Sequence, residues 1–194
     1  MTRTAWTFLV TAIAVFMAAL DNLVVTTALP VIRADFDATI SELEWMVNAY
    51  TLTFAVLLLT GAALGDRFGR KRLFIIGIAL FTAGSAAAAL SSTSTELIIA
   101  RAIQGIGGAV LTPLSLTILS AAVSPERRAV ALGAWGGIAG LAIAIGPLVG
   151  GAIAEGLAWQ WIFWVNVPIG LVAIPLAWFR LEESHGPSTR LDLP

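Results

Sequence analysis

The chain has 194 residues, of which 58% are apolar and only 12% are charged, and its net charge at pH 7 is −1. A soluble domain carries about a quarter charged residues, and so short a chain cannot place the excess of apolar residues in a larger core. The composition therefore argues against a soluble enzyme, a disordered chain or a nucleic-acid-binding protein, and the absence of cysteine removes disulfides, thiol catalysis and cysteine-ligated metals.

Six segments are apolar enough to cross a bilayer core about 30 Å thick, which takes roughly 20 residues of helix. They predict an all-α membrane protein with a six-helix bundle over residues 1–180 and a polar tail over 181–194. The first span is too long for a signal peptide and lacks a clean cleavage site, so we expect it to be retained. The spans are Trp6–Leu29, Trp45–Leu64, Leu73–Leu90, Leu97–Val123, Ala129–Ile153 and Trp161–Phe179.

Signals for helix ends lie between the spans. Ser41 and Glu44 have the spacing of a capping box, and Ser124 precedes Pro125 as an N-cap precedes proline at the first helical position. Four tryptophans fall at span ends, where aromatic belts form in membranes. They are Trp45, Trp159, Trp161 and Trp178.

The basic residues predict the orientation, because cytoplasmic loops are enriched in lysine and arginine. Nine basic residues lie at the ends that would face one side of the membrane, against Arg33 alone on the other. This distribution places both termini in the cytoplasm. The nine are Arg3, Arg67, Arg70, Lys71, Arg72, Arg127, Arg128, Arg180 and Arg190.

Two ionisable residues, Asp21 and Arg101, lie well inside the spans. An ionisable group at the centre of a span costs about 2.5–3.5 kcal/mol on insertion scales, so it needs a reason. Counted from the outer ends of their predicted spans, the depths of Asp21 and Arg101 in the membrane differ by only a few ångströms. Two side chains can bridge that gap. The pair is either a buried structural salt bridge or a site where Asp21 exchanges a proton and Arg101 adjusts its affinity for that proton.

Two amides accompany this pair. Asn22 follows Asp21, and Gln104 lies one turn after Arg101 on the same helix face. Such amides either hold helices together or line a polar cavity near the middle of the membrane.

Small and charged residues mark two further regions. The fifth span is rich in glycine at G-x-x-x-G spacing, which allows two helices to approach closely, and Pro147 is expected to bend it.

The compact loop 61–72 carries four basic residues together with Asp66. We expect Asp66 to cap the third helix and to pair with neighbouring arginines. This cluster either enforces topology or locks one arrangement of two helix bundles.

Motifs of enzymes are missing from the sequence, which has no phosphate-binding loop, dinucleotide fingerprint, nucleophile elbow or zinc-protease motif. We therefore expect neither an enzyme nor a bound metal or cofactor.

Five motifs lie in order along the chain: Leu20–Pro30, residues 61–72, Arg101–Gly105, Gly146–Gly151 and Trp159–Phe163 with Asn166–Gly170. In these motifs the chain resembles the amino-terminal half of a major facilitator superfamily transporter, and most of all the drug:proton antiporters with 14 spans. The resemblance implies two three-helix repeats and export of amphipathic organic compounds from the cell, driven by the proton gradient across the plasma membrane.

The resemblance also implies roles for single residues. Asp21 and Arg101 would take part in proton coupling, with Asn22 and Gln104 at the substrate cavity. A cytoplasmic latch would include Asp66, Arg67, Gly69 and Arg70. The antiporter motif would include Gly146, Pro147, Gly150 and Gly151.

The substrate site of this superfamily lies between two six-helix halves, so the expected partners are a drug-like small molecule, protons, the bilayer and a second half in the same longer chain or another copy. Two alternatives stay open. One is a proton-coupled or facilitated transporter of a metabolite, and the other is a half-length membrane fragment that does not transport.

Overall fold

The computed structural model describes residues 2–186, with the backbone only at 154 and 155. Within this range the elements are α1 (Arg3–Phe36), α2 (Ile40–Phe68), α3 (Arg70–Ala89), α4 (Ser94–Ala122), α5 (Pro125–Gly156), α6 (Trp161–Trp164) and α7 (Asn166–Arg180). Six helical stretches of the described residues, with α6 and α7 counted as one, are long and apolar enough to span a membrane. Helices satisfy their backbone groups internally, as the bilayer core requires. The predicted six-span, all-α bundle is confirmed, and residues 187–194 of the expected tail lie outside the described residues.

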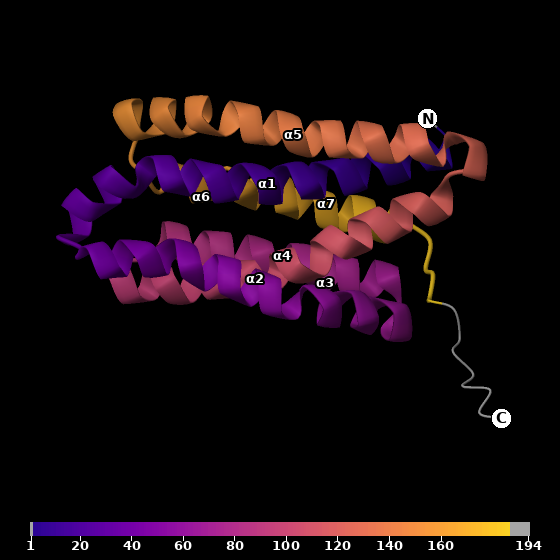
Figure 1. The fold of residues 1–194 in the computed structure, drawn as a ribbon, viewed down its shortest axis with the longest axis horizontal. Coiled ribbons are helices and arrows are strands. Elements are labelled where there is room, and N and C mark those ends of the chain that lie inside the picture. Colours follow the sequence, from indigo (N-terminus) through magenta and orange to yellow (C-terminus); the bar gives the residue numbers. More distant parts are fainter. Residues whose placement is uncertain (1, 187–194) are drawn as a thin grey trace.

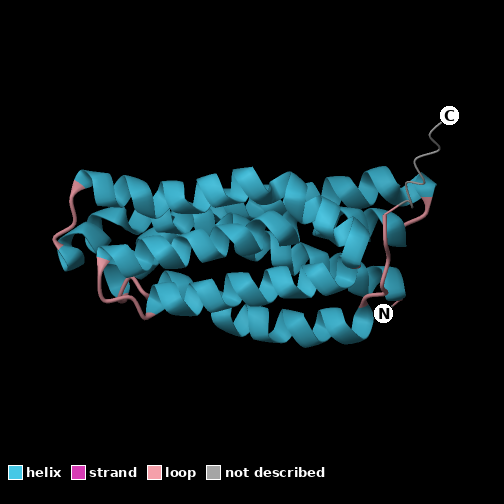
Figure 2. Ribbon diagram, turned by 90° about the horizontal axis from the view of Figure 1, so that it is seen from below, coloured by secondary structure: helices cyan, strands magenta, loops and turns pink. Residues whose placement is uncertain are grey.

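The helices run side by side along the long axis of the molecule (Figures 1 and 2). In Figure 1, α1 and α5 form the upper part, and α2, α3 and α4 form the lower part. The most extensive packing joins α4 to α2 and α3, and α1 to α5, while α7 packs against α3 and α1. The start of α1, the α2–α3 junction, the α4–α5 turn and the end of α7 lie at one end, which we call the basic end. Arg33 lies at the other end.

Polar side chains cap several helix starts, but the predicted capping box is misplaced by two residues. The N-cap of α2 is Thr39, not Ser41. Thr39 Oγ1 accepts from Glu42 N at 3.3 Å, and Glu42 Oε2 accepts from Thr39 N at 2.8 Å. The predicted pair Ser41/Glu44 and the observed pair Thr39/Glu42 have the same three-residue spacing. Helix α2 begins after Thr39 because the turn between α1 and α2 ends there. Ser124 occupies the N-cap position of α5 with Pro125 in the first turn, as predicted, but its side chain makes no capping hydrogen bond.

The charged loop expected over 61–72 is almost entirely helical. α2 continues to Phe68 and α3 starts at Arg70, so Gly69 alone separates them. Gly69 has φ +109°, a conformation that side chains with a Cβ rarely adopt. Asp66 therefore lies in the last turn of α2 and does not cap α3, whose N-cap is Gly69.

The sixth span is divided into α6 and α7 at Val165. Pro168 has no N–H to donate to the carbonyl of Trp164, so the regular helix pattern is interrupted there. The tryptophans at the span ends also differ. Trp45, Trp161 and Trp178 are half-exposed, whereas Trp159 is only 2% exposed. Trp159 packs against Phe36 and donates its indole N–H to Asp35 Oδ2 at 2.8 Å, so it is a core residue rather than a belt residue.

The apolar interior consists of two clusters that follow each other along the bundle. The cluster toward the basic end includes Met17, Phe81 and Leu111, and the other includes Val24, Leu97 and Phe163. Where the two clusters meet, α1, α3, α4 and α7 each contribute buried polar side chains. Those residues, from different helices, form a polar layer across the middle of the bundle: Asp21, Ser85, Arg101, Gln104 and Asn166.

Helices α3 and α4 approach so closely that glycine is required between them. A Cβ at Gly107 would lie 2.6 Å from the backbone nitrogen of Phe81 and 2.8 Å from the carbonyl oxygen of Gly77. Backbone atoms of a packed helix cannot yield as a side-chain tip can. The two helices therefore form a fixed scaffold for the polar layer.

Gly107→Ala is expected to destabilise the protein by about 1–3 kcal/mol, the usual cost of overpacking a core. The measurement is thermal unfolding of the purified protein in detergent. The control is Ala83→Val, which adds more volume at an exposed position of α3. Equal unfolding temperatures for Gly107→Ala and the wild type would show that α3 and α4 separate easily.

Candidate functional site

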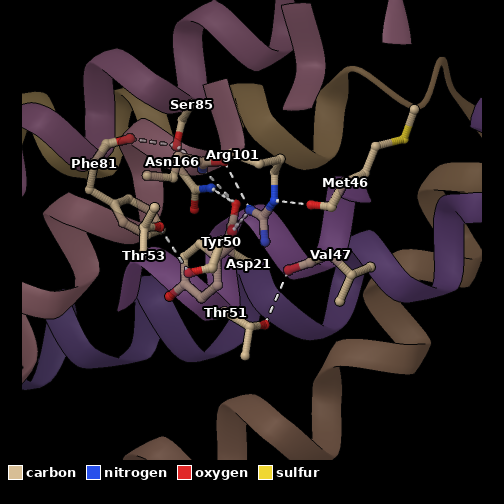
Figure 3. A network of polar contacts seen from close by, with 11 residues as sticks. Asp21, Met46, Val47, Tyr50, Thr51, Thr53, Phe81, Ser85, Arg101 and Asn166 are labelled. Atoms are coloured by element: carbon tan, nitrogen blue, oxygen red, sulfur yellow. Dashed lines mark hydrogen bonds and ion pairs between the residues drawn. The ribbon is translucent and has the colours of Figure 1, made fainter. Parts of the chain in front are cut away.

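The polar layer is built by four helices that each contribute buried side chains (Figure 3). Asp21 comes from α1, Ser85 from α3, Arg101 and Gln104 from α4, and Asn166 from α7. None of the five is more than 2% exposed. Burial of so many polar groups is costly unless they bind one another, and the hydrogen bonds of the layer satisfy that condition.

Asp21 and Arg101 form an ion pair, as their similar depths predict. Arg101 Nη1 lies 2.5 Å from Asp21 Oδ2, and both side chains are fully buried. Gln104 binds both partners, since its Oε1 accepts from Arg101 Nη1 at 2.8 Å and its Nε2 donates to Asp21 Oδ1 at 3.0 Å. The predicted shared face of Arg101 and Gln104 is confirmed.

Two members of the layer carried no predicted role. Asn166 Nδ2 donates to Asp21 Oδ1 at 2.8 Å, and Ser85 Oγ accepts from Gln104 Nε2 at 2.7 Å. Neither residue is charged, so neither stands out in an apolar span as Asp21 does. A signal existed for Asn166, because amides in spans are rare and it belongs to the sixth-span motif.

The guanidinium of Arg101 also contacts groups outside the layer. Its Nε donates to the carbonyl oxygen of Met46 at 3.3 Å, and its central carbon lies 4.4 Å from the centroid of the Tyr50 ring. Nη2 has no hydrogen-bond partner among the described residues. Aromatic faces attract such a cation when it is withdrawn from water. Tyr50 is thus the nearer of two aromatic contacts of the buried charge, the other being Phe163 at 5.9 Å.

Asp21 accepts three hydrogen bonds and donates none, as an ionised carboxylate does. Arg101, Gln104 and Asn166 all donate to it, so a proton on Asp21 requires at least one of them to move or turn. The donors come from α4 and α7, while Asp21 belongs to α1. A movement of a donor would therefore change the contacts between these helices. The hydrogen bonds of one carboxylate thus join three spans.

A groove of about 480 Å³ lies beside this layer. Its wall is mostly apolar, with polar contributions from Asn22, Tyr50, Thr51 and Thr112. Tyr50 contacts the Arg101 guanidinium and also lines the groove. Asn22 is at the groove as expected for a cavity residue, whereas Gln104 is fully buried in the polar layer and does not line it.

The cluster at the α2–α3 junction contains one of the expected ion pairs. Asp66 Oδ1 lies 2.7 Å from Arg70 Nε, and the Arg70 side chain is only 15% exposed. Arg67 lies over the Phe68 ring, 5.2 Å from its centroid. The pairing predicted for Asp66 is confirmed, while its predicted capping of α3 is wrong.

The glycines of the antiporter motif divide into two groups. A Cβ at Gly146 would lie 2.8 Å from Leu23 Cβ, and one at Gly150 would lie 2.9 Å from Thr27 Cβ, so both allow α5 to pack on α1. Pro147 is inside α5, which continues through it. Other α5 glycines meet no atom of the described residues within 4 Å; these are Gly133, Gly136, Gly137, Gly140, Gly151 and Gly156.

Asn166→Leu is expected to destabilise the protein by about 1–3 kcal/mol, because it withdraws a donor from a buried carboxylate. Thermal unfolding in detergent measures the effect. Asn48→Leu is the matched control, since Asn48 is an exposed residue of α2. Equal stability of the two variants would show that the Asn166 hydrogen bond is dispensable.

Comparisons with known proteins agree with this fold. The model of the Major Facilitator Superfamily matches residues 11–192. The cephamycin export protein of Amycolatopsis lactamdurans is 42% identical over 201 aligned residues, covering 100% of this chain and 41% of that protein. The methylenomycin A resistance protein of Bacillus subtilis is 41% identical over 186 residues, covering 95% of this chain and 40% of that protein.

A third relative is the tetracenomycin C resistance and export protein of Streptomyces glaucescens. It is 38% identical over 168 residues, which cover 87% of this chain and 31% of that protein. The chain thus spans well under half the length of these three relatives.

Proposed function

Because the chain belongs to the Major Facilitator Superfamily, we propose that it is the amino-terminal six-helix half of a proton-coupled multidrug efflux transporter. Its substrates would be amphipathic organic compounds. The observation that carries this proposal is the fully buried Asp21–Arg101 pair beside a groove of mixed apolar and polar character. The family is one of membrane transporters, not of enzymes.

The names of the relatives support export as the direction of transport. The three described above are named for resistance to, or export of, antibiotics. The groove suits such compounds, since its apolar wall accepts hydrocarbon and Asn22 and Thr112 offer hydrogen bonds. The proposed driving force is the inward movement of protons.

Proton coupling would centre on Asp21. In this proposal a proton reaches Asp21 when its donors turn away, and the loss of negative charge releases Arg101 from the ion pair. The freed guanidinium would then move against the Tyr50 ring, which it contacts in the structure and which lines the groove. Proton binding thereby changes the wall of the groove, and binding of a cationic substrate opposes it.

The orientation we propose places the basic end in the cytoplasm of the producing cell, with the plasma membrane as the location. Arg3, the α2–α3 junction, Arg127 and Arg180 gather at this end, as the positive-inside rule requires of a cytoplasmic face.

A second six-helix half is the proposed partner. Only 17% of the most apolar window of α2 and 11% of that of α5 is buried within the described residues, against 61% for α1 and α4. The α5 glycines without a neighbour lie on the exposed face of α5, where they allow another helix to approach closely. The second half would belong to the same longer protein, with a second copy of this chain as the alternative.

The mass of the native gene product tests this part of the proposal. A product of about twice 20.3 kDa or more, seen on a blot of source membranes, is expected from a two-half transporter. A 20.3 kDa product would favour a dimer of halves or a fragment that does not transport.

Transport itself is tested by reconstituting the native gene product into vesicles with a proton gradient imposed in either direction. Export requires a fluorescent amphipathic cation to move against the direction of the protons. Movement in the same direction as the protons, or of a polar metabolite alone, would establish the alternative of a metabolite transporter.

A further inference from the structure

Helix α3 starts without a side-chain cap from its own sequence. Its N-cap is Gly69, which has no side chain to accept a hydrogen bond. The first amides of a helix have no partner within the helix. The N–H groups of Arg70, Lys71 and Arg72 therefore need acceptors from elsewhere.

Those acceptors come from the segment after α7, far along the chain. The carbonyl oxygen of Ser184 accepts from Arg70 N at 2.8 Å. The Glu183 carboxylate accepts from Lys71 N through Oε1 at 2.9 Å and from Arg72 N through Oε2 at 3.3 Å. A negative charge is thereby placed at the positive end of the α3 dipole.

The junction has a shape that admits this carboxylate. A Cβ at Gly69 would lie 2.7 Å from Glu183 Cδ, so any side chain there would displace it. Leu181 anchors the same segment in the apolar core, and Gly186 N donates to the carbonyl oxygen of Asp66 at 3.0 Å. We call residues 181–186 the strap. In Figure 1 it leaves the end of α7 at the basic end of the bundle.

We propose that Glu183 is a positioning residue of the α2–α3 junction. Its carboxylate caps α3 and fastens the strap to the junction, so that Asp66, Arg70 and the chain beyond the sixth span move as one unit. This role rests on the proposed transport function, in which a latch at the junction opens and closes. In a two-half protein the chain beyond the strap leads toward the second half, and Glu183 would transmit movement between them.

Amide hydrogen exchange of the native gene product in lipid nanodiscs tests the cap without requiring transport. Glu183→Ala is expected to raise the rate of amide exchange in residues 70–75 about tenfold, which corresponds to the stability typically lost when an N-cap is removed. Glu183→Gln, which keeps one carbonyl oxygen, should give a smaller rise. Glu182→Ala is the control, because Glu182 pairs with Arg3 instead. Equal exchange in Glu183→Ala and the wild type would overturn the proposal.

Efflux by the same variants tests the positioning role. We expect the efflux rate of Glu183→Ala to fall several-fold at an unchanged amount of protein in the membrane, with Glu183→Gln between it and the wild type. Faster exchange with unchanged efflux would reduce Glu183 to a structural cap and overturn its role in transport. If the wild type itself moves no substrate, the transport proposal fails, and the exchange result still decides the cap.

Discussion

Asp21→Asn is expected to reduce proton-driven efflux to the level of vesicles without protein, while the variant still inserts in the membrane. Asparagine has nearly the shape of aspartate and can still accept from Arg101, but it cannot bind and release a proton. Because it also leaves the buried Arg101 charge without a counterion, the amount of folded variant in the membrane is measured together with efflux. If Asp21 carries the transported proton, the gradient loses its only coupling point among the described residues. The assay measures export of a fluorescent amphipathic cation per amount of protein, with an inward proton gradient imposed.

The matched control is Asp37→Asn, which makes the same chemical change on an exposed residue at the end of α1. Its φ of 48° suits asparagine as well as aspartate. We expect efflux by Asp37→Asn to equal that of the wild type. Undiminished efflux by Asp21→Asn would remove Asp21 from proton coupling and leave the pair a structural salt bridge. Facilitated movement of substrate down its own gradient should survive in Asp21→Asn.

The fold was predictable because its signals are strong and local. An apolar stretch of about 20 residues has few ways to satisfy its backbone in lipid, so the six spans follow from the sequence. The similar depths of Asp21 and Arg101 could be counted from the ends of the apolar stretches, although α1 continues past the predicted end at Leu29 to Phe36. Helix geometry places Gln104 beside Arg101. These three members of the polar layer needed no tertiary information.

The rest depended on contacts between distant segments. Asn166 is an amide in an apolar span, which marks it in the sequence, but the identity of its partner Asp21 requires knowing that α7 packs beside α1. Asp66 was expected to cap α3 because it precedes that helix, but α2 continues through it to Phe68. The cap comes instead from Glu183, which lies 112 residues after Lys71. No local pattern reports such a pairing.

Arg101→Met is expected to destabilise the protein by about 3–5 kcal/mol, because removal of one partner leaves the other charge buried without compensation. Methionine fills most of the volume of the arginine stem, so the loss comes mainly from Asp21. Thermal unfolding in detergent measures it. The double variant Asp21→Asn/Arg101→Met should regain much of the stability, since a buried ion pair can be replaced by neutral groups at little cost.

The double variant separates the two interpretations of the buried pair. In a purely structural salt bridge, restored stability would bring restored efflux, because the helices are again held together. In the proton-coupling interpretation, Asp21→Asn/Arg101→Met is stable and still fails to use the gradient, since neither side chain carries a titratable group. Stability would then depend on the contact between residues 21 and 101, and transport on the titratable carboxyl group of Asp21. The contact alone would not explain why two charges lie in the middle of a membrane bundle. Recovery of efflux together with stability would contradict the coupling role of the pair.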